Sequence, residues 1–264
     1  MRFFHHLFIL NARDASTPSW TPRVVSALTA AGLIAGVFCF SFYRLTYHWN
    51  FAIVWKYREK FLTGWLITIG LSLVALALST LLGTVTALAR RSRLLPFRYF
   101  ATIYVELVRG TPLLVQILVF FYVVADAFHL QNRYVAGVMI LSIFAGAYIS
   151  EIIRAGIEGV GQSQRESAKA IGLTPFQTYR YVVFPQALRQ ILPPLAGQFV
   201  SLIKDSSLLS IISINEFTLN AQQVNAYTYS TLESYLPLAV GYLILTLPVS
   251  LWIRHLEHKV SYAT

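Results

Sequence analysis

Residues 61–91 read FLTGWLITIGLSLVALALSTLLGTVTALARR. The 29 residues from Phe61 to Ala89 contain no charged side chain, and two arginines follow at once. An α-helix needs about 20 apolar residues to cross the roughly 30 Å hydrocarbon core of a bilayer. This run therefore predicts a membrane-spanning helix.

Five further segments have the same character. The six predicted spanning helices lie at about residues 23–43, 61–89, 99–124, 134–158, 190–213 and 233–254. Alternation of apolar and polar residues with period two is absent, which excludes a transmembrane β-barrel. We expect an all-α membrane protein with a single membrane-embedded domain.

Composition supports this class and argues against others. Of the 264 residues, 56% are hydrophobic and 12% are charged, against roughly 25% charged in an average soluble domain. The net charge is +10, but the basic residues sit between apolar segments, which is typical of membrane topology and not of nucleic-acid binding. The single cysteine, Cys39, excludes a disulfide framework and a cysteine-based metal motif.

The basic connections predict the orientation. Two connections, after the second and fourth spans, are rich in basic residues and should face the cytoplasm: Arg90, Arg91, Arg93 and Arg98 in one, and Arg165, Lys169, Arg180 and Arg189 in the other. Both termini then lie in the cytoplasm. Residues 44–60 conflict with this topology, because this basic connection would lie outside. The alternative that residues 1–43 are a signal peptide is disfavoured, since no clear cleavage site follows.

The connection that begins at Gln162 reads QSQRESAKAIGLTPFQTYRYVVFPQALRQILPP. It predicts two short helices, the first ended by Gly172 and the second begun by Thr174 as N-cap with Pro175 and Gln177 behind it. We expect Pro185 to end the second helix, and Pro193 with Pro194 to stiffen the start of the next span. Such an ordered platform fits a docking surface, or an amphipathic segment that binds lipid headgroups.

The spacing within this connection has a specific resemblance. Glu166, Ser167 and Ala168, then Gly172, then the segment 182–185 (VVFP), resemble the E-A-A-x3-G-x9-I-x-L-P signature of permease subunits in bacterial ABC importers. The departures at Ser167, Val182 and Phe184 keep small or apolar character. Three other segments resemble permeases for polar amino acids of the histidine, glutamine, glutamate and arginine group: LVRGTPLLVQ at 107–116, SEIIRAGI at 150–157 and LIKDSSLLSIIS at 202–213.

The resemblance implies a transport subunit of the bacterial inner membrane that is not itself an enzyme. It implies that the first short helix couples to a cytoplasmic ATPase subunit, through Glu166, Ser167, Ala168, Gly172 and Pro185. ATP and Mg would be bound by that ATPase, since this chain has no G-x-x-x-x-G-K-[S/T] phosphate loop. The other implied partners are a second permease, identical or paralogous, and an extracytoplasmic amino-acid-binding protein.

We expect three regions. Residues 1–60 would form an N-terminal tail, an extra helix and an external loop, since related permeases commonly have five spans. Residues 61–258 would form the permease domain, with the coupling loop at about 161–190. Residues 259–264 would be a C-terminal tail.

Charged residues at bilayer depth are candidate transport residues, because burying them in lipid costs free energy. An amino acid zwitterion needs a cation for its carboxylate and an acceptor for its ammonium group. The candidates for the substrate path are Glu106, Arg109, Thr111, Gln116, Lys204, Asp205, Ser206 and Ser207. The alternative is that Glu106 with Arg109, and Glu151 with Arg154, only neutralise each other, and that the serines only permit close helix packing.

Two other function classes have weaker support. A membrane-embedded enzyme would need G-x-S-x-G, H-E-x-x-H or an intramembrane histidine, and the sequence has none of them. An ion channel would need a carbonyl filter or an arginine-repeat sensor helix, which are also absent. His255 and His258 lie at the end of the last span without a third metal ligand nearby, so we expect no metal site.

Overall fold

A computed structural model describes residues 20–261. The chain divides into two units, Met1–Trp49 and Asn50–Thr264, which are treated separately. In the first unit, helix α2 (Trp20–Arg44) confirms the predicted first span.

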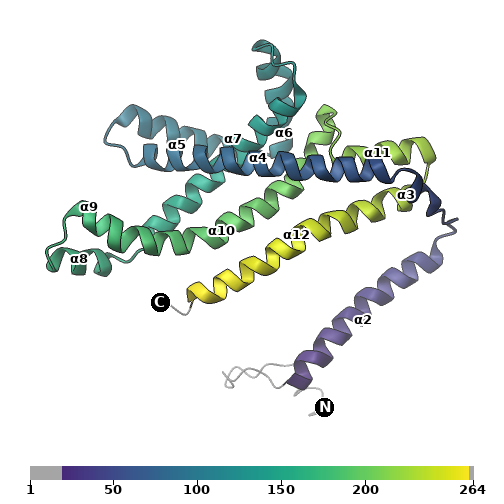
Figure 1. Cartoon of the computed structure of the whole chain (residues 1–264), viewed down its shortest axis with the longest axis horizontal. Helices are drawn as coiled ribbons and strands as arrows, with labels where there is room; N and C mark the ends of the chain where they lie inside the picture. Colours follow the sequence, from purple (N-terminus) through teal and green to yellow (C-terminus); the bar gives the residue numbers. More distant parts are fainter. Residues whose placement is uncertain (1–19, 262–264) are drawn as a thin grey trace. The chain divides into compact units, whose positions relative to one another are not determined.

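All regular secondary structure in the described part of the second unit is helical (Figure 1). Its elements are α3 (Ala52–Lys56), α4 (Arg58–Arg90), α5 (Leu95–Arg109), α6 (Leu113–Val119), the π-helical turn η1 (Phe120–Ala125), α7 (Arg133–Glu158), α8 (Gln162–Ala170), α9 (Pro175–Thr178), the π-helical turn η2 (Tyr179–Val183), α10 (Phe184–Asp205), the 3-10 helix η3 (Ser206–Ile212), α11 (Phe217–Thr228) and α12 (Thr231–Ser261).

Helices α4 and α7 pack against each other at the centre of this unit. Small residues allow the close approach: a Cβ added to Gly83 of α4 would lie 2.7 Å from Ile149 Cγ2 and 2.9 Å from the Gly146 carbonyl oxygen of α7. Helix α10 packs on α7 and α12, and α11 packs on α4 and α12. Small-residue contacts of this kind are typical of helix packing in membranes.

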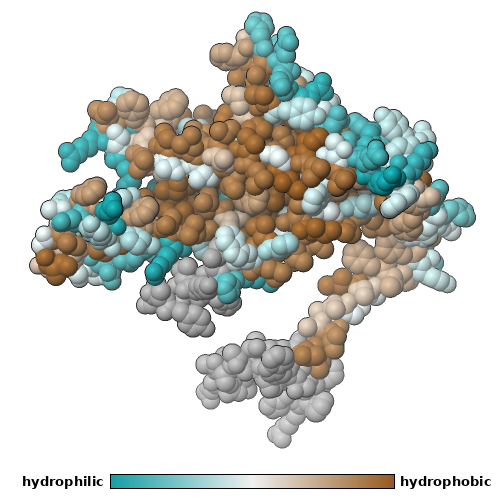
Figure 2. Space-filling view, viewed as in Figure 1, coloured by the Kyte–Doolittle hydropathy of each residue, from teal (hydrophilic) through white to brown (hydrophobic). Residues whose placement is uncertain are grey.

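The outer surface of this unit is largely apolar. Figure 2 shows hydrophobic residues across its middle and hydrophilic residues gathered toward its ends. Helix α4 alone exposes Leu66, Leu73 and Leu81 by 50 to 64%. Among the described residues, five helices are long and apolar enough to cross a membrane, or six with α5 to η1 counted as one broken span. The predicted multi-pass helical fold is confirmed.

The third predicted span is not a straight helix. The pieces Leu95–Arg109 and Leu113–Ala125 meet at an angle of 110° (Figure 1). Gly110 ends α5 and Pro112, with ψ 139°, precedes α6. Since proline has no N–H and disfavours helix in the residue before it, Pro112 breaks the span at this point.

The prediction that Pro185 ends a short helix is wrong. A helical stretch runs from Pro175 to Ile212, so it begins well before the predicted residue 190 and continues through Pro193 and Pro194. Pro185 lies in the first turn of α10, directly after the π-helical turn η2. A π-helical turn shifts the pairing of backbone groups, and it accommodates the missing N–H of proline without ending the helix.

Helix α11 was not predicted from the sequence. Its buried face consists of Phe217, Ala221 and Val224, which pack with Phe61 at the start of α4. Glu216 is the N-cap of α11: its carboxylate accepts hydrogen bonds from the backbone N–H groups of Thr218 (2.8 Å) and Leu219 (2.7 Å). The spacing of its buried residues, at i, i+4 and i+7, was the available signal.

Glu216 lies between the spanning segments and is fully buried. Burial raises the pKa of its carboxyl group from 4.5 to about 7, although the two N–H groups and the Tyr242 hydroxyl, 3.2 Å away, favour the charged form. The folded chain therefore holds this proton more tightly than the unfolded chain does. The free energy of unfolding should fall as the pH rises from about 4.5 to about 7, and stay level above that.

We expect Glu216→Gln to remove this part of the pH dependence, worth up to about 3 kcal/mol, because each pH unit between the two pKa values corresponds to about 1.4 kcal/mol. The check is thermal unfolding of the purified chain in detergent between pH 5 and pH 8. Glu59→Gln, at an exposed position near the start of α4, controls for the loss of one carboxylate. Equal pH profiles for wild type and Glu216→Gln would contradict the prediction.

Candidate functional site

The connection between α7 and α10 has the predicted local structure. Gly172 follows α8 with φ +83°, and the N–H of Leu173 donates to the Ala168 carbonyl at 3.1 Å, which closes the end of α8. Thr174 caps α9 through its hydroxyl, which accepts from the N–H of Gln177, while the Gln177 side chain accepts from the N–H of Thr174 at 2.9 Å. The two short helices are thus held in a fixed hairpin.

This hairpin presents both polar and apolar groups on its surface. Glu166 and Ser167 are exposed, and Glu166 accepts a hydrogen bond from Gln162 at 2.7 Å. Ala168 is buried, whereas Ile171 and Phe176 are 76% and 71% exposed. An ordered element with exposed large apolar side chains is typical of a protein-binding surface.

Arg109 and Glu106 of α5 do not pair with each other. The Arg109 guanidinium lies 3.8 Å from the Glu151 carboxylate of α7, and 5.6 Å from the centre of the Tyr148 ring. The Glu106 side chain is exposed and has no hydrogen-bond or ion-pair partner in the part of the chain that the structure describes. The alternative of mutual neutralisation therefore fails for this pair.

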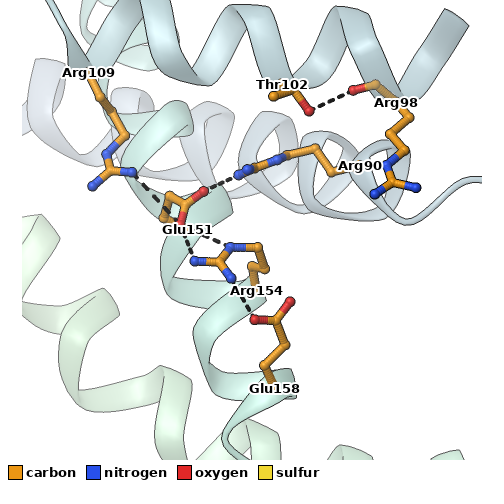
Figure 3. Close-up of polar contacts among 7 residues, drawn as sticks. All are labelled: Arg90, Arg98, Thr102, Arg109, Glu151, Arg154 and Glu158. Atoms are coloured by element: carbon orange, nitrogen blue, oxygen red, sulfur yellow. Dashed lines mark hydrogen bonds and ion pairs between the residues drawn. The ribbon is translucent and has the colours of Figure 1, made fainter. Parts of the chain in front are cut away.

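Glu151 is the centre of a charge cluster (Figure 3). Its carboxylate is paired with Arg90 at the end of α4 and accepts hydrogen bonds from Arg154 at 2.7 and 3.0 Å. Arg154 also pairs with Glu158 at 2.5 Å. The Glu151 side chain is only 16% exposed. The neutralisation expected for Glu151 and Arg154 is confirmed, and Arg90 and Arg109 extend it to three helices. Arg90 was predicted to lie in a basic connection, and its pairing with Glu151, 61 residues away, has no signal in the local sequence.

Thr111 and Gln116 hold the break between α5 and α6. The Gln116 amide nitrogen donates to the Val108 carbonyl at 2.7 Å and lies 2.8 Å from the Thr111 hydroxyl. The Thr111 hydroxyl donates to the Leu107 carbonyl at 2.9 Å. These side chains thus satisfy carbonyl groups that the broken helix leaves without N–H partners, which a membrane environment requires.

The remaining candidates lie where α10 passes into η3. Lys204 is exposed and Asp205 is half-buried, and neither forms an ion pair with a described residue. Ser206 is buried and donates to the Ile203 carbonyl at 2.8 Å, and Ser207 is half-buried beside it. The 3-10 helix η3 contacts α6. The fold therefore brings the two groups of candidates onto neighbouring elements, without a direct bond between them.

Comparison with known proteins gives a family. Residues 79–262 match the model of the binding-protein-dependent transport system inner membrane component. The chain belongs to this family. The match begins within α4 and includes the α8–α9 hairpin, the Glu151 cluster and the α10–η3 junction. Members are membrane-spanning permease subunits of ABC transporters, and ATP hydrolysis takes place in a separate subunit.

Individual relatives agree with the family match. The permease is 33% identical over 212 residues to the probable glutamine ABC transporter permease protein GlnM of Bacillus subtilis, covering 80% of this chain and 98% of that protein. It is 39% identical over 196 residues to the L-cystine transport system permease protein TcyB of the same organism, covering 74% and 83%.

Solved structures show the same fold. A crystal structure of an amino acid ABC transporter with histidines has a TM-score of 0.76 and 35% identity to the permease, over 81% of this chain and all of that one. The MetNI methionine ABC transporter, at 15% identity and a TM-score of 0.60, shares the fold. The resemblance seen in the sequence is confirmed.

The Glu151 cluster generates a stability prediction. Glu151→Gln would leave Arg90, Arg109 and Arg154 of the permease close together without their common carboxylate. We expect the free energy of unfolding to fall by about 2 to 4 kcal/mol. This is near the low end of the cost of breaking a buried ion pair, because the Glu151 side chain is partly exposed. Glu158→Gln is the matched control: its side chain is 54% exposed, so the cost should be below about 1 kcal/mol. Thermal unfolding in detergent measures both, and equal losses would contradict the central role of Glu151.

Proposed function

We propose that this permease forms part of the path by which a polar amino acid enters the cell, driven by ATP hydrolysis in a partner subunit. The named relatives support this substrate class, since their names refer to glutamine, L-cystine and glutamate/aspartate. The partners would be two cytoplasmic ATPase subunits that bind ATP and Mg, a second permease, identical or paralogous, and an extracytoplasmic amino-acid-binding protein. Both termini would face the cytoplasm.

The proposal that this chain couples to an ATPase rests on the ordered structure of the α8–α9 hairpin. The hairpin is fixed by the positive φ of Gly172 and by the reciprocal cap of Thr174 and Gln177. It exposes Glu166 and large apolar side chains. We assign ATPase contact to Glu166 and Ser167 at its surface. Ala168 and Gly172 would keep its shape, and Pro185 would mark the start of the helix that follows it.

The unpaired charges support a substrate path. Glu106, Lys204 and Asp205 have no ion-pair partner among the described residues, although Asp205 and Lys204 lie within a spanning helix. Charges at bilayer depth need water, another subunit or a ligand as partner. Glu106 and Asp205 would meet the ammonium group of the substrate, and Lys204 its carboxylate. Arg109, Thr111, Gln116, Ser206 and Ser207 would shape the path, through the bonds described above.

The first experiment tests coupling. The tagged chain is purified from its native membrane, and the ATPase that comes with it is quantified by mass spectrometry. We expect Glu166→Lys and Gly172→Val to lower ATPase recovery at least tenfold, because the first reverses a surface charge and the second strains the left-handed turn. Gly172→Asn should retain the ATPase, since asparagine tolerates positive φ. Glu59→Lys controls for charge reversal at an exposed position elsewhere on the permease.

Recovery of the ATPase with all variants at the wild-type level would refute docking by the hairpin. Failure to recover any ATPase with a folded wild-type chain would contradict the proposed docking of an ATPase on this permease.

The second experiment tests the substrate path. The assembled transporter and its binding protein are reconstituted in vesicles, and uptake of labelled glutamine, glutamate, histidine and cystine is measured. We expect Lys204→Gln and Asp205→Asn each to lower uptake at least tenfold without loss of the ATPase. Asp126→Asn, at an exposed position beyond η1, is the control. Undiminished uptake would show that these charges do not line the path, and uptake without ATP would indicate a channel.

A further inference from the structure

A small cavity lies beside the α8–α9 hairpin. Its volume is about 250 Å³, and its polar wall consists of Arg91, Arg165, Lys169, Thr178 and Tyr179. Arg91 directly follows α4, Arg165 and Lys169 belong to α8, and Thr178 ends α9. Cationic side chains from two separate parts of the chain therefore converge on one space.

The charges of this cavity are not compensated within the described residues. None of its three cations forms an ion pair there. The nearest acidic residues along the chain do not line it: Glu158 is paired with Arg154, and Glu166 is bonded to Gln162. An anion in the cavity would thus lie near three uncompensated cations.

Two buried donors in the cavity wall also have no acceptor. Arg165 is held by one bond, from Nη2 to the Ile157 carbonyl at 2.6 Å, but its Nε is buried without a partner. Thr178 is only 8% exposed, and its hydroxyl is likewise unpartnered. A buried donor without an acceptor costs about 1 to 3 kcal/mol. Arg165 and Thr178 both line the cationic cavity, so an acceptor from outside the chain that enters it would lie near both unpartnered donors.

The position and volume of the cavity indicate which kind of anion it can hold. Arg91 follows the last residue of the spanning helix α4, Ile157 is in the last turn of α7, and Val183 directly precedes α10; all three line the cavity. The cavity thus lies where the spanning helices α4 and α7 end, at the level of lipid headgroups, where tyrosines such as Tyr179 are common. Its volume is below the roughly 300 to 1,000 Å³ of sites for whole small molecules, so it fits a headgroup and not a nucleotide.

We propose that this cavity binds one phosphate group, supplied by an acidic phospholipid or by inorganic phosphate. The Arg165 Nε–H and the Thr178 hydroxyl donate to phosphate oxygens, and Arg91 and Lys169 neutralise its charge. A phosphate group offers more acceptor oxygens to these four side chains than a carboxylate does. The bound group would hold the end of α4 to the α8–α9 hairpin.

The test uses the purified full-length chain in an uncharged detergent. Three probes are titrated and followed by calorimetry: dihexanoyl phosphatidylglycerol, dihexanoyl phosphatidylcholine and inorganic phosphate. The variant Arg91→Gln/Lys169→Gln removes two exposed cations of the cavity, and Thr178→Val removes the buried hydroxyl at nearly constant volume. Arg93→Gln/Arg180→Gln removes the same charge from exposed positions that do not line the cavity.

We expect saturable binding of phosphatidylglycerol that weakens at least tenfold in Arg91→Gln/Lys169→Gln, weakens in Thr178→Val, and is unchanged in Arg93→Gln/Arg180→Gln. Phosphatidylcholine should bind at least tenfold more weakly, since its choline is repelled by the cations. Saturable binding of phosphatidylglycerol identifies a lipid source, and the same pattern with inorganic phosphate alone identifies a free anion. Equal weakening in both double variants, equal binding of phosphatidylcholine, or no saturable binding of any probe would overturn the proposal.

Discussion

The breaks within the membrane-spanning helices reflect one constraint: a backbone group inside a membrane must find its hydrogen-bond partner within the protein. Pro112 breaks the third span, and the Gln116 amide supplies a donor to the Val108 carbonyl that the break leaves open. Pro185 lacks an N–H, and the π-helical turn η2 precedes it. The span then tightens into 3-10 geometry at Ser206–Ile212. The bends therefore occur where side chains or altered helical pairing satisfy the backbone.

Charged side chains in the membrane-spanning helices also need partners, and the described residues supply them for some charges and not for others. Glu151 is enclosed by Arg90, Arg109 and Arg154, so the ends of α4 and α5 are held to α7. Glu106, Lys204 and Asp205 have no such partner among the described residues. A paired cluster fixes helices, whereas unpaired charges in a membrane helix need a partner from outside the chain. This contrast separates the structural charges of the permease from its candidate transport charges, which the sequence alone could not do.

Sequence patterns were most reliable where local physics determines the structure. The apolar segments located the membrane-spanning helices, although the third is broken at Pro112 and the fifth begins earlier than predicted. The Gly172 terminator and the Thr174–Gln177 cap were correct because each depends on neighbouring residues only. Long-range contacts were not predictable in this way. Pairing of Arg109 with Glu151 instead of Glu106 depends on how α5 lies against α7. The continuous helix through Pro185 and the packing of α11 on α4 likewise depend on tertiary structure.

Contacts around the α8–α9 hairpin connect it to the spanning helices α7 and α10. Arg165 of α8 is bonded to the Ile157 carbonyl in the last turn of α7. At the preceding residue, Gly156, there is so little space that an added Cβ would lie 2.4 Å from Ile191 of α10. Densely packed helices shift as units and do not deform locally. We therefore expect a displacement of α8 to move the ends of α7 and α10 with it. Since α7 holds Glu151 and α10 ends at Lys204 and Asp205, such a movement would reach both groups of charges.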